Sequence, residues 1–218
     1  MALAFEIDIR PRPSAGAIEV IAGIILAAGA SSRMGSPKAL LEYRGERFVQ
    51  RLVRVLSPVC HRVIVVLGYH AAAIRPSIPA AATVVINPAP ERGQLSSLQT
   101  GLAAVLAEAD EFLFTPVDSP AVEVETVERL AAEFRRRNPA TLLVIPRIGT
   151  PDGLKRGHPI FAARTIAEEI LALPPTGRAS DVIHAHIPQT VYVDVNDPGI
   201  LTDIDDHEAY RRLSETVK

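Results

Sequence analysis

Short, almost uninterrupted apolar runs alternate with amphipathic stretches along this chain, and this alternation restricts the fold more than any other feature. The runs at 20–26, 62–68 and 111–115 are rich in β-branched or aromatic residues and end at small residues, glycine or proline. Such runs are typical of strands buried on both faces. Between the first two, residues 48–56 place apolar side chains at helical spacing with arginines between them. The pattern predicts an α/β fold with a mainly parallel sheet covered by helices on both sides.

The other expected elements continue the same order. We expect further strands over 83–86, 142–145, 157–162 and 191–193, and helices over 96–107, 123–137, 164–173, 179–186 and 205–213. Serine opens the helix expected at 96–107, and serine is a good N-cap residue. With 218 residues the chain has the length of one α/β domain. We expect that domain over 18–218, preceded at 1–17 by a proline-containing extension that is flexible or forms an edge strand.

Composition excludes several classes of protein. A net charge of −2 gives no support to a globally basic nucleic-acid binder. The single cysteine, Cys60, excludes an internal disulfide and a site with several cysteine ligands, and it suits a reducing compartment. No apolar run is long and unbroken enough to span a bilayer, and the N-terminus lacks the apolar region of a signal peptide. We therefore expect a cytoplasmic protein with no nucleic-acid or membrane partner.

The segment after the first expected strand carries the most informative motif. Residues 26–38 read LAAGASSRMGSPK, in which small residues let backbone N–H groups approach an anion, and Arg33 and Lys38 add positive charge. The glycine spacing fits neither a Walker A loop nor Gly-x-Gly-x-x-Gly, so a nicotinamide or flavin cofactor is not supported. A flexible strand-to-helix connection would explain the glycines and serines alone. The added arginine and lysine favour phosphate binding.

This motif, followed by ALLEYRG, resembles the signature of the MobA-like nucleotidyltransferases. Its Ala-Ala-Gly and Ser-Pro-Lys variant is most similar to the molybdenum cofactor cytidylyltransferases, whereas the guanylyltransferase branch usually reads Leu-Ala-Gly-Gly with Asp-Lys. Weaker landmarks follow in the family's order at 92–102, 115–120, 157–161 and 197–210. The resemblance implies a three-layer, Rossmann-like nucleotidyltransferase fold whose central sheet is mainly parallel but mixed.

The resemblance also implies the chemistry. The enzyme would use Mg²⁺ to transfer CMP from CTP to a phosphorylated acceptor, molybdopterin carrying molybdenum, and would release pyrophosphate. A molybdenum hydroxylase that receives the product is a further implied partner.

Carboxylates at two places in the chain are candidates for holding the metal. Asp118 follows the strand expected at 111–115, and a carboxylate at the C-terminal tip of a strand is well placed to bind Mg²⁺. Val-Asp-Ser-Pro is equally good turn chemistry, and only the resemblance favours the metal. The second place is the acidic segment 194–208, where the resemblance points to Asp203 and then to Asp205. The Asp-His-Glu-Ala that follows departs from the family's Thr-Pro-Glu-Asp.

The resemblance distributes further roles among the remaining residues. The catalytic residues would be Arg33, Lys38 and Asp118, with the two cations stabilising charge on the leaving pyrophosphate. Nucleotide contacts are implied for Leu26, Ala27, Ala28, Gly29, Gly35, Gln94 and Ser97. Acceptor contacts are implied for Lys155, Arg156 and His158, although a lone histidine is more often a structural one.

Two other functions stay open. A pyrophosphorylase acting on a sugar phosphate or another small phosphorylated acceptor would share the nucleotide half of the site. A non-catalytic molybdenum cofactor carrier that docks onto a hydroxylase is the other, and the intact Lys38 and Asp118 argue against it.

Overall fold

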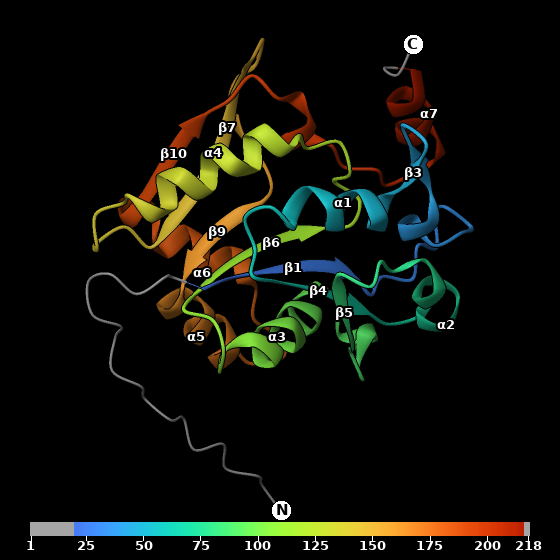
Figure 1. The fold of residues 1–218 in the computed structure, drawn as a ribbon, viewed down its shortest axis with the longest axis horizontal. Helices are drawn as coiled ribbons and strands as arrows, with labels where there is room; N and C mark the ends of the chain where they lie inside the picture. The colour runs from blue at the N-terminus through green and yellow to red at the C-terminus, as the bar shows by residue number, and fades with distance from the viewer. Residues whose placement is uncertain (1–19, 216–218) are drawn as a thin grey trace, which may run out of the picture.

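One mixed sheet lies between two layers of helices in the computed structural model of this protein, which describes residues 20–215 (Figure 1). The strands lie in the order β10-β7-β9-β6-β1-β4-β5, with β8 paired to β7. All are parallel to one another except β9, which is antiparallel to β6 and β7, and β8. The strands are β1 (Ile21–Ala27), β4 (Arg62–Leu67), β5 (Ala82–Ile86), β6 (Glu111–Pro116), β7 (Leu143–Thr150), β8 (Gly153–Arg156), β9 (Ile160–Ala163) and β10 (Thr190–Asp194).

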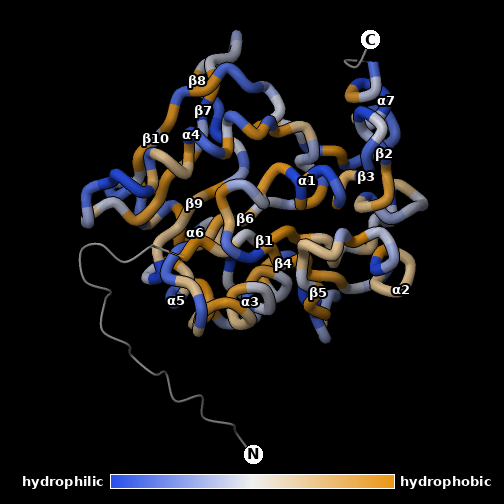
Figure 2. Tube along the Cα trace, viewed as in Figure 1, coloured by the Kyte–Doolittle hydropathy of each residue, from blue (hydrophilic) through white to orange (hydrophobic). Residues whose placement is uncertain are grey.

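Each face of the sheet has its own hydrophobic core. One core is covered by α1 (Phe48–Leu56) and α4 (Val124–Arg135), and the other by α3 (Gln94–Val105), α5 (Arg164–Ala172) and α6 (Ala179–Ala185). Every residue of β1 is buried, and its side chains alternate between the two cores, as the two-residue period of a strand requires. Apolar residues accordingly concentrate on the central strands and the inner sides of the helices (Figure 2). The predicted mainly parallel, three-layer α/β fold is confirmed.

Short elements that carry no apolar pattern escaped the sequence analysis. These are the hairpin of β2 (Glu42–Tyr43) and β3 (Glu46–Arg47), the single turn α2 (Ala71–Ile74), and β8, all of whose residues are exposed. The helix α7 (His207–Glu215) lies beside this hairpin at one end of the molecule (Figure 1).

The predicted serine cap of the third helix is wrong. α3 begins at Gln94, two residues earlier than expected, and Gly93 is its N-cap with no capping side chain. Ser96 lies inside the first turn, where its hydroxyl donates a hydrogen bond to the Gly93 carbonyl at 2.9 Å. The strand expected at 157–162 begins only at Ile160. Both differences are at element ends, where local sequence patterns determine least.

Asp197 in the acidic segment has a structural role. Its buried carboxylate accepts hydrogen bonds from the Glu123 N–H at 2.9 Å, the Thr126 hydroxyl at 2.7 Å and the Gly199 N–H at 2.8 Å. It therefore holds the first turn of α4 to the 3-10 helix η5 (Pro198–Leu201). In contrast to the buried Asp197, Asp194 is exposed and pairs with Arg147 at the surface.

Within residues 20–215, no helix combines the length and the apolar character needed to cross a membrane. The N-terminal extension expected at 1–17 lies outside the described residues.

We predict that Asp197→Ala destabilises the fold by about 3 kcal/mol, because it leaves buried donors at Glu123, Thr126 and Gly199 without their acceptor. Urea unfolding followed by circular dichroism measures the change. Asp194→Ala is the matched control, since an exposed ion pair contributes little to stability. Equal effects of the two substitutions would contradict the role assigned to Asp197.

Candidate active site

A cavity of about 670 Å³ opens at the edge of the sheet where the parallel strands β1 and β6 end. Ligands of open α/β sheets bind at this edge, outside the carboxyl ends of the strands. The cavity is walled by the loop after β1, by the residues after β6 and by the segment between η5 and α7. The structure thus brings together the two stretches from which the sequence analysis expected the phosphate site and the metal site.

The loop after β1 is folded into a compact turn. Ser31 has a left-handed backbone (φ +51°), and its hydroxyl accepts a hydrogen bond from the Lys38 N–H at 3.1 Å, which closes the loop on itself. Of the residues of this loop implied to contact the nucleotide, Leu26, Ala27 and Gly29 line the cavity, and Ala28 and Gly35 do not. Gly35 instead supplies a turn residue with φ +62°.

Ala28 is buried, and its backbone lies close to Gly68 at the end of β4. A Cβ added to Gly68 would lie 2.6 Å from the Ala28 carbonyl oxygen and 2.9 Å from the Ala28 Cβ. The base of the loop and the end of β4 therefore pack without spare volume on this side of the cavity.

The Lys38 ammonium joins two carboxylates that are distant in sequence. Lys38 Nζ lies 3.0 Å from Asp118 Oδ2 and 2.8 Å from Asp205 Oδ1, and Arg33 reaches the other oxygen of Asp205 at 2.9 Å. Burial alone would lower the pKa of Lys38, but its hydrogen bonds and charge interactions with Asp205 and Asp118 outweigh burial and raise it. The hydrogen bond from Lys38 in turn lowers the pKa of Asp205. Lys38 is therefore positively charged and Asp205 negatively charged at neutral pH.

Asp203 and Asp205 are positioned by the residue between them. Ile204 is buried, and its N–H donates a hydrogen bond to the Asp118 carbonyl at 3.1 Å. In an extended segment alternate side chains point to the same side, so burial of Ile204 turns both aspartates away from the core. One carboxylate oxygen from each of Asp118, Asp203 and Asp205 lies within 4.8 Å of the others.

This carboxylate cluster fits a divalent cation. Oxygen donors at this spacing suit hard cations such as Mg²⁺ and Mn²⁺. Burial, together with the charges of Asp118 and Asp205, raises the pKa of Asp203, which reflects an excess of negative charge that a cation would neutralise. Asp205, the second choice of the sequence analysis, has the closest contacts to Lys38 and Arg33.

Tyr210 of α7 fixes this arrangement from the outside. Its hydroxyl accepts a hydrogen bond from the Glu42 N–H at 3.3 Å and donates one to the Glu42 carbonyl at 3.0 Å. Its ring packs edge-on against Phe48. Glu42 follows the 3-10 helix η1 (Lys38–Leu40) closely, so the contact ties the segment after Asp205 to the segment after Lys38.

The residues expected to bind the acceptor separate in the structure. Arg156 and His158 line the cavity, whereas Lys155 does not and pairs with Asp152 at 3.3 Å. Neighbouring side chains on β8 point to opposite faces, which explains the difference between Lys155 and Arg156. His158 stacks edge-on against Phe114, and burial lowers its pKa, so the ring is neutral at pH 7.

The side of the site next to β4 and β5 contains two residues that the sequence analysis missed. Tyr69 lines the cavity, and Asn87 is buried and donates hydrogen bonds to the hydroxyls of Ser96 and Ser97 at 2.9 and 3.0 Å. Ser97 and Gln94, for which the resemblance implied nucleotide contacts, also line the cavity. Tyr69 and Asn87 come just after β4 and β5. Their position beyond the end of an expected strand is the sequence feature that could have identified them.

Comparison with known proteins agrees with this geometry. The family profile described as the MobA-like NTP transferase domain matches residues 23–191. The chain belongs to the MobA-like NTP transferase family. It is a nucleotidyltransferase, and the resemblance of its loop motif to this family is confirmed.

Two relatives with different names each align with most of this chain. The chain is 31% identical over 198 residues to a nicotine blue oxidoreductase of Paenarthrobacter nicotinovorans, covering 88% of this chain and 96% of that protein. It is 30% identical over 191 residues to a probable molybdenum cofactor guanylyltransferase of Rhodopirellula baltica, covering 82% and 89% of the two chains.

A solved structure shares the same fold. The crystal structure of Rv0371c from Mycobacterium tuberculosis has a TM-score of 0.75 at 31% identity and covers 91% of this chain and 99% of that one. The same protein has also been solved in complex with manganese, at a TM-score of 0.69 and 28% identity over 90% and 99% of the two chains.

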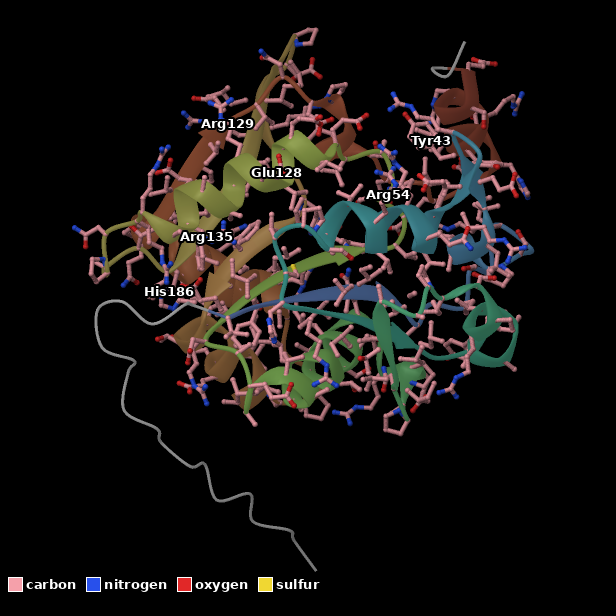
Figure 3. All side chains as sticks on the ribbon, in the orientation of Figure 1. Tyr43, Arg54, Glu128, Arg129, Arg135 and His186 are labelled. Carbon is pink, nitrogen blue, oxygen red and sulfur yellow. The ribbon has the colours of Figure 1, made fainter. Side chains whose placement is uncertain are left out.

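We predict that Lys38→Met lowers nucleotidyl-transfer turnover by about 10²-fold, because it removes a cation from the centre of the charge cluster. Steady-state pyrophosphate release measures this loss. Arg129→Ala, which removes a cation from the exposed side of α4, serves as the control (Figure 3). An unchanged turnover with a raised KM would show that Lys38 only binds substrate.

Proposed function

We propose that this nucleotidyltransferase transfers CMP from CTP to the phosphate of molybdopterin carrying molybdenum, releasing pyrophosphate. The observation that carries the proposal is the single cavity in which Arg33 and Lys38 meet the carboxylates of Asp118, Asp203 and Asp205. We place the reaction in the cytoplasm, with a molybdenum hydroxylase as the partner that takes the product.

The residues perform this transfer by positioning and charge balance. An oxygen of the acceptor phosphate forms a bond to the α-phosphorus of the nucleotide as the bond from that phosphorus to the bridging β-oxygen breaks. The leaving pyrophosphate gains negative charge, which Arg33 and Lys38 stabilise from the loop after β1. The reaction needs no covalent intermediate on the protein, because holding both phosphates in line supplies much of the rate.

Asp118, Asp203 and Asp205 would hold the divalent cation, which we propose to be Mg²⁺. When bound, the cation supplies further neutralisation of the phosphate charge. The manganese complex of the mycobacterial relative supports a divalent cation in this family.

We base the choice of CTP over GTP on the loop after β1. The sequence has Ala28 where the guanylyltransferase branch usually has glycine, and Ser-Pro precedes Lys38. Ala28 is buried between two residues that line the cavity, and its Cβ packs against Gly68 without spare volume. The methyl group therefore fixes the loop backbone at Ala27 and Gly29, and in our proposal this fixed backbone selects the pyrimidine base. The relatives named guanylyltransferases make GTP the competing nucleotide.

We predict that Ala28→Gly lowers the preference for CTP over GTP by about tenfold, because removing the methyl group packed against Gly68 frees the backbone of the loop that lines the cavity. The ratio of kcat/KM for the two nucleotides measures the preference. Ala140→Gly, in an exposed turn on the opposite side of the sheet, should leave the ratio unchanged. A ratio unaffected by Ala28→Gly would show that other residues select the base.

A screen of CTP, GTP, ATP and UTP with molybdenum cofactor tests the function itself, with pyrophosphate as the readout. We predict release with CTP in the presence of Mg²⁺ and loss of it with EDTA. Asp118→Asn should lower the rate by about 10²-fold or more, because it removes a charged cation ligand. Glu128→Gln makes the same chemical change on the exposed side of α4 and should have no effect (Figure 3). Full activity of Asp118→Asn would overturn the proposal.

The same assays separate the competing functions. Release with a sugar phosphate but not with molybdenum cofactor would indicate a sugar-phosphate pyrophosphorylase, and cofactor binding without release would indicate a carrier. An oxidoreductase is a second candidate, because the relative from Paenarthrobacter that aligns over most of both chains has that name. It predicts that NADH or NADPH is oxidised as added nicotine blue is reduced, a reaction that requires no nucleoside triphosphate and persists in Asp118→Asn.

A further inference from the structure

A buried arginine lies on the inner side of α1. Arg51 is 3% exposed, although the sequence pattern places arginines between the apolar residues of this helix. Arg54, three residues further along, follows that pattern, because its side chain is 49% exposed and pairs with Glu46. Burying a guanidinium is costly, and an apolar side chain in its place is often at least as stabilising. The burial of Arg51 therefore indicates a role other than filling the core.

The guanidinium of Arg51 holds the segment that follows Asp118. Its Nε donates a hydrogen bond to the Pro120 carbonyl at 2.8 Å. Its Nη2 donates to the Val122 carbonyl at 3.3 Å and to Glu123 Oε2 at 2.9 Å. Pro120 and Val122 are buried, so their carbonyls need a donor from within the protein. Because the guanidinium is a rigid planar fork, these bonds fix the path of the backbone between Asp118 and α4.

The same guanidinium contacts the hairpin that follows Lys38. It lies over the Tyr43 ring, 5.2 Å from the ring centroid, and its Nη1 lies 4.0 Å from Glu46 Oε2. Tyr43 belongs to β2 and Glu46 to β3, and both strands follow Lys38 and η1 in the chain. Arg51 therefore connects the segment after Lys38 to the segment after Asp118, in addition to the ion pair of those two residues at 3.0 Å.

The position of Asp118 also determines that of the other two carboxylates. The Asp118 carbonyl accepts the hydrogen bond from the Ile204 N–H at 3.1 Å, and Ile204 lies between Asp203 and Asp205. A shift of the backbone at Asp118 would thus change the spacing of all three carboxylates, whose oxygens lie within 4.8 Å of one another.

We propose that Arg51 is a positioning residue for the cation site. By fixing the segment after Asp118 to the hairpin after Lys38, it holds the three carboxylates at the spacing that a divalent cation requires. Arg51 does not line the cavity, so it acts through the backbone and not by contact with cation or substrate. Groups that orient metal ligands affect metal affinity nearly as much as the ligands themselves do. The inference deepens the proposed function and rests on it for the cation.

The test measures the binding of Mn²⁺ to the full chain without nucleotide, from the decrease in the electron paramagnetic resonance signal of free Mn²⁺. Arg51→Met keeps a long unbranched side chain but removes the hydrogen bonds of the guanidinium. It should raise the dissociation constant for Mn²⁺ about tenfold, as loss of a group that orients metal ligands does. Arg51→Lys keeps the charge without the fork and should raise the constant by a smaller factor. The Mn²⁺ concentration that gives half-maximal pyrophosphate release should rise in the same order.

Two control variants separate positioning from stability. Arg54→Met makes the same chemical change three residues along α1, at an exposed side chain that pairs with Glu46, and should leave Mn²⁺ binding unchanged. Ile166→Ala makes a cavity in the other core, on α5, which begins beside Asp110 at the opposite end of β6 from Asp118. It should lower the urea midpoint of unfolding and leave Mn²⁺ binding unchanged.

Equal Mn²⁺ affinity of the wild type and Arg51→Met, with both folded by circular dichroism, would overturn the inference and leave the proposed function in place. If Arg51→Met is unfolded, a wild-type Mn²⁺ affinity of Arg51→Lys would overturn it. Weakened binding by Ile166→Ala to the same extent as by Arg51→Met would also overturn it, because loss of stability alone would then account for the effect.

Failure of the proposed function has a different result. A wild type that binds no Mn²⁺ would reject the cation site of that function and the role of Arg51 with it. Mn²⁺ binding that depends on Arg51, with no pyrophosphate from any nucleotide and molybdenum cofactor, would support the positioning role and reject the proposed reaction.

Discussion

The ion pairs at Lys38 are the interaction on which the rest of the site depends. They connect the loop after β1 to Asp118, 80 residues away, and to Asp205, 167 residues away. Three carboxylates whose oxygens come within 4.8 Å of each other repel, and this repulsion must be balanced by positive charge. The ammonium of Lys38 and the guanidinium of Arg33 supply that charge from the protein itself. The same charges that hold the segments together are those that a polyphosphate or a cation would meet.

The order of the strands in the sheet brings these charged segments together. β1 and β6 are adjacent and parallel, so the residues that follow them emerge at one edge. Asp203 and Asp205 do not follow a strand next to β1. They follow β10, which lies at the far edge of the sheet. The chain returns from β10 through η5, and the hydrogen bond from Ile204 to Asp118 aligns it beside β6. Asp197 secures the start of this return and Tyr210 its end. The acidic segment is therefore partly scaffold and partly site.

The cavity at the ends of β1 and β6 carries charges that compensate one another. Their geometry is set by ion pairs between segments that are far apart in the sequence.

Much of the fold and part of the site could be predicted from the sequence. Hydrophobic periodicity is a local property, and it located the strands of the sheet other than β8 and the helices that cover its two faces, because those elements bury whole faces. The same reasoning missed β8 and the β2–β3 hairpin, which bury little and so leave no pattern. The loop motif predicted a phosphate site for a similar reason: small residues, arginine and lysine occur there within one short segment.

Only the tertiary structure decided which carboxylates meet which cations. Asp194, Asp197, Asp203 and Asp205 are equivalent as acidic residues in the sequence, yet one pairs at the surface, one caps a helix and two face the cavity. Alternation on β8 placed Arg156 in the cavity and Lys155 outside it. The sequence by itself determined the layers, the loop and the family resemblance. The charge pairing required the packing of segments far apart in the chain, because a contact between remote residues depends on the path of everything between them.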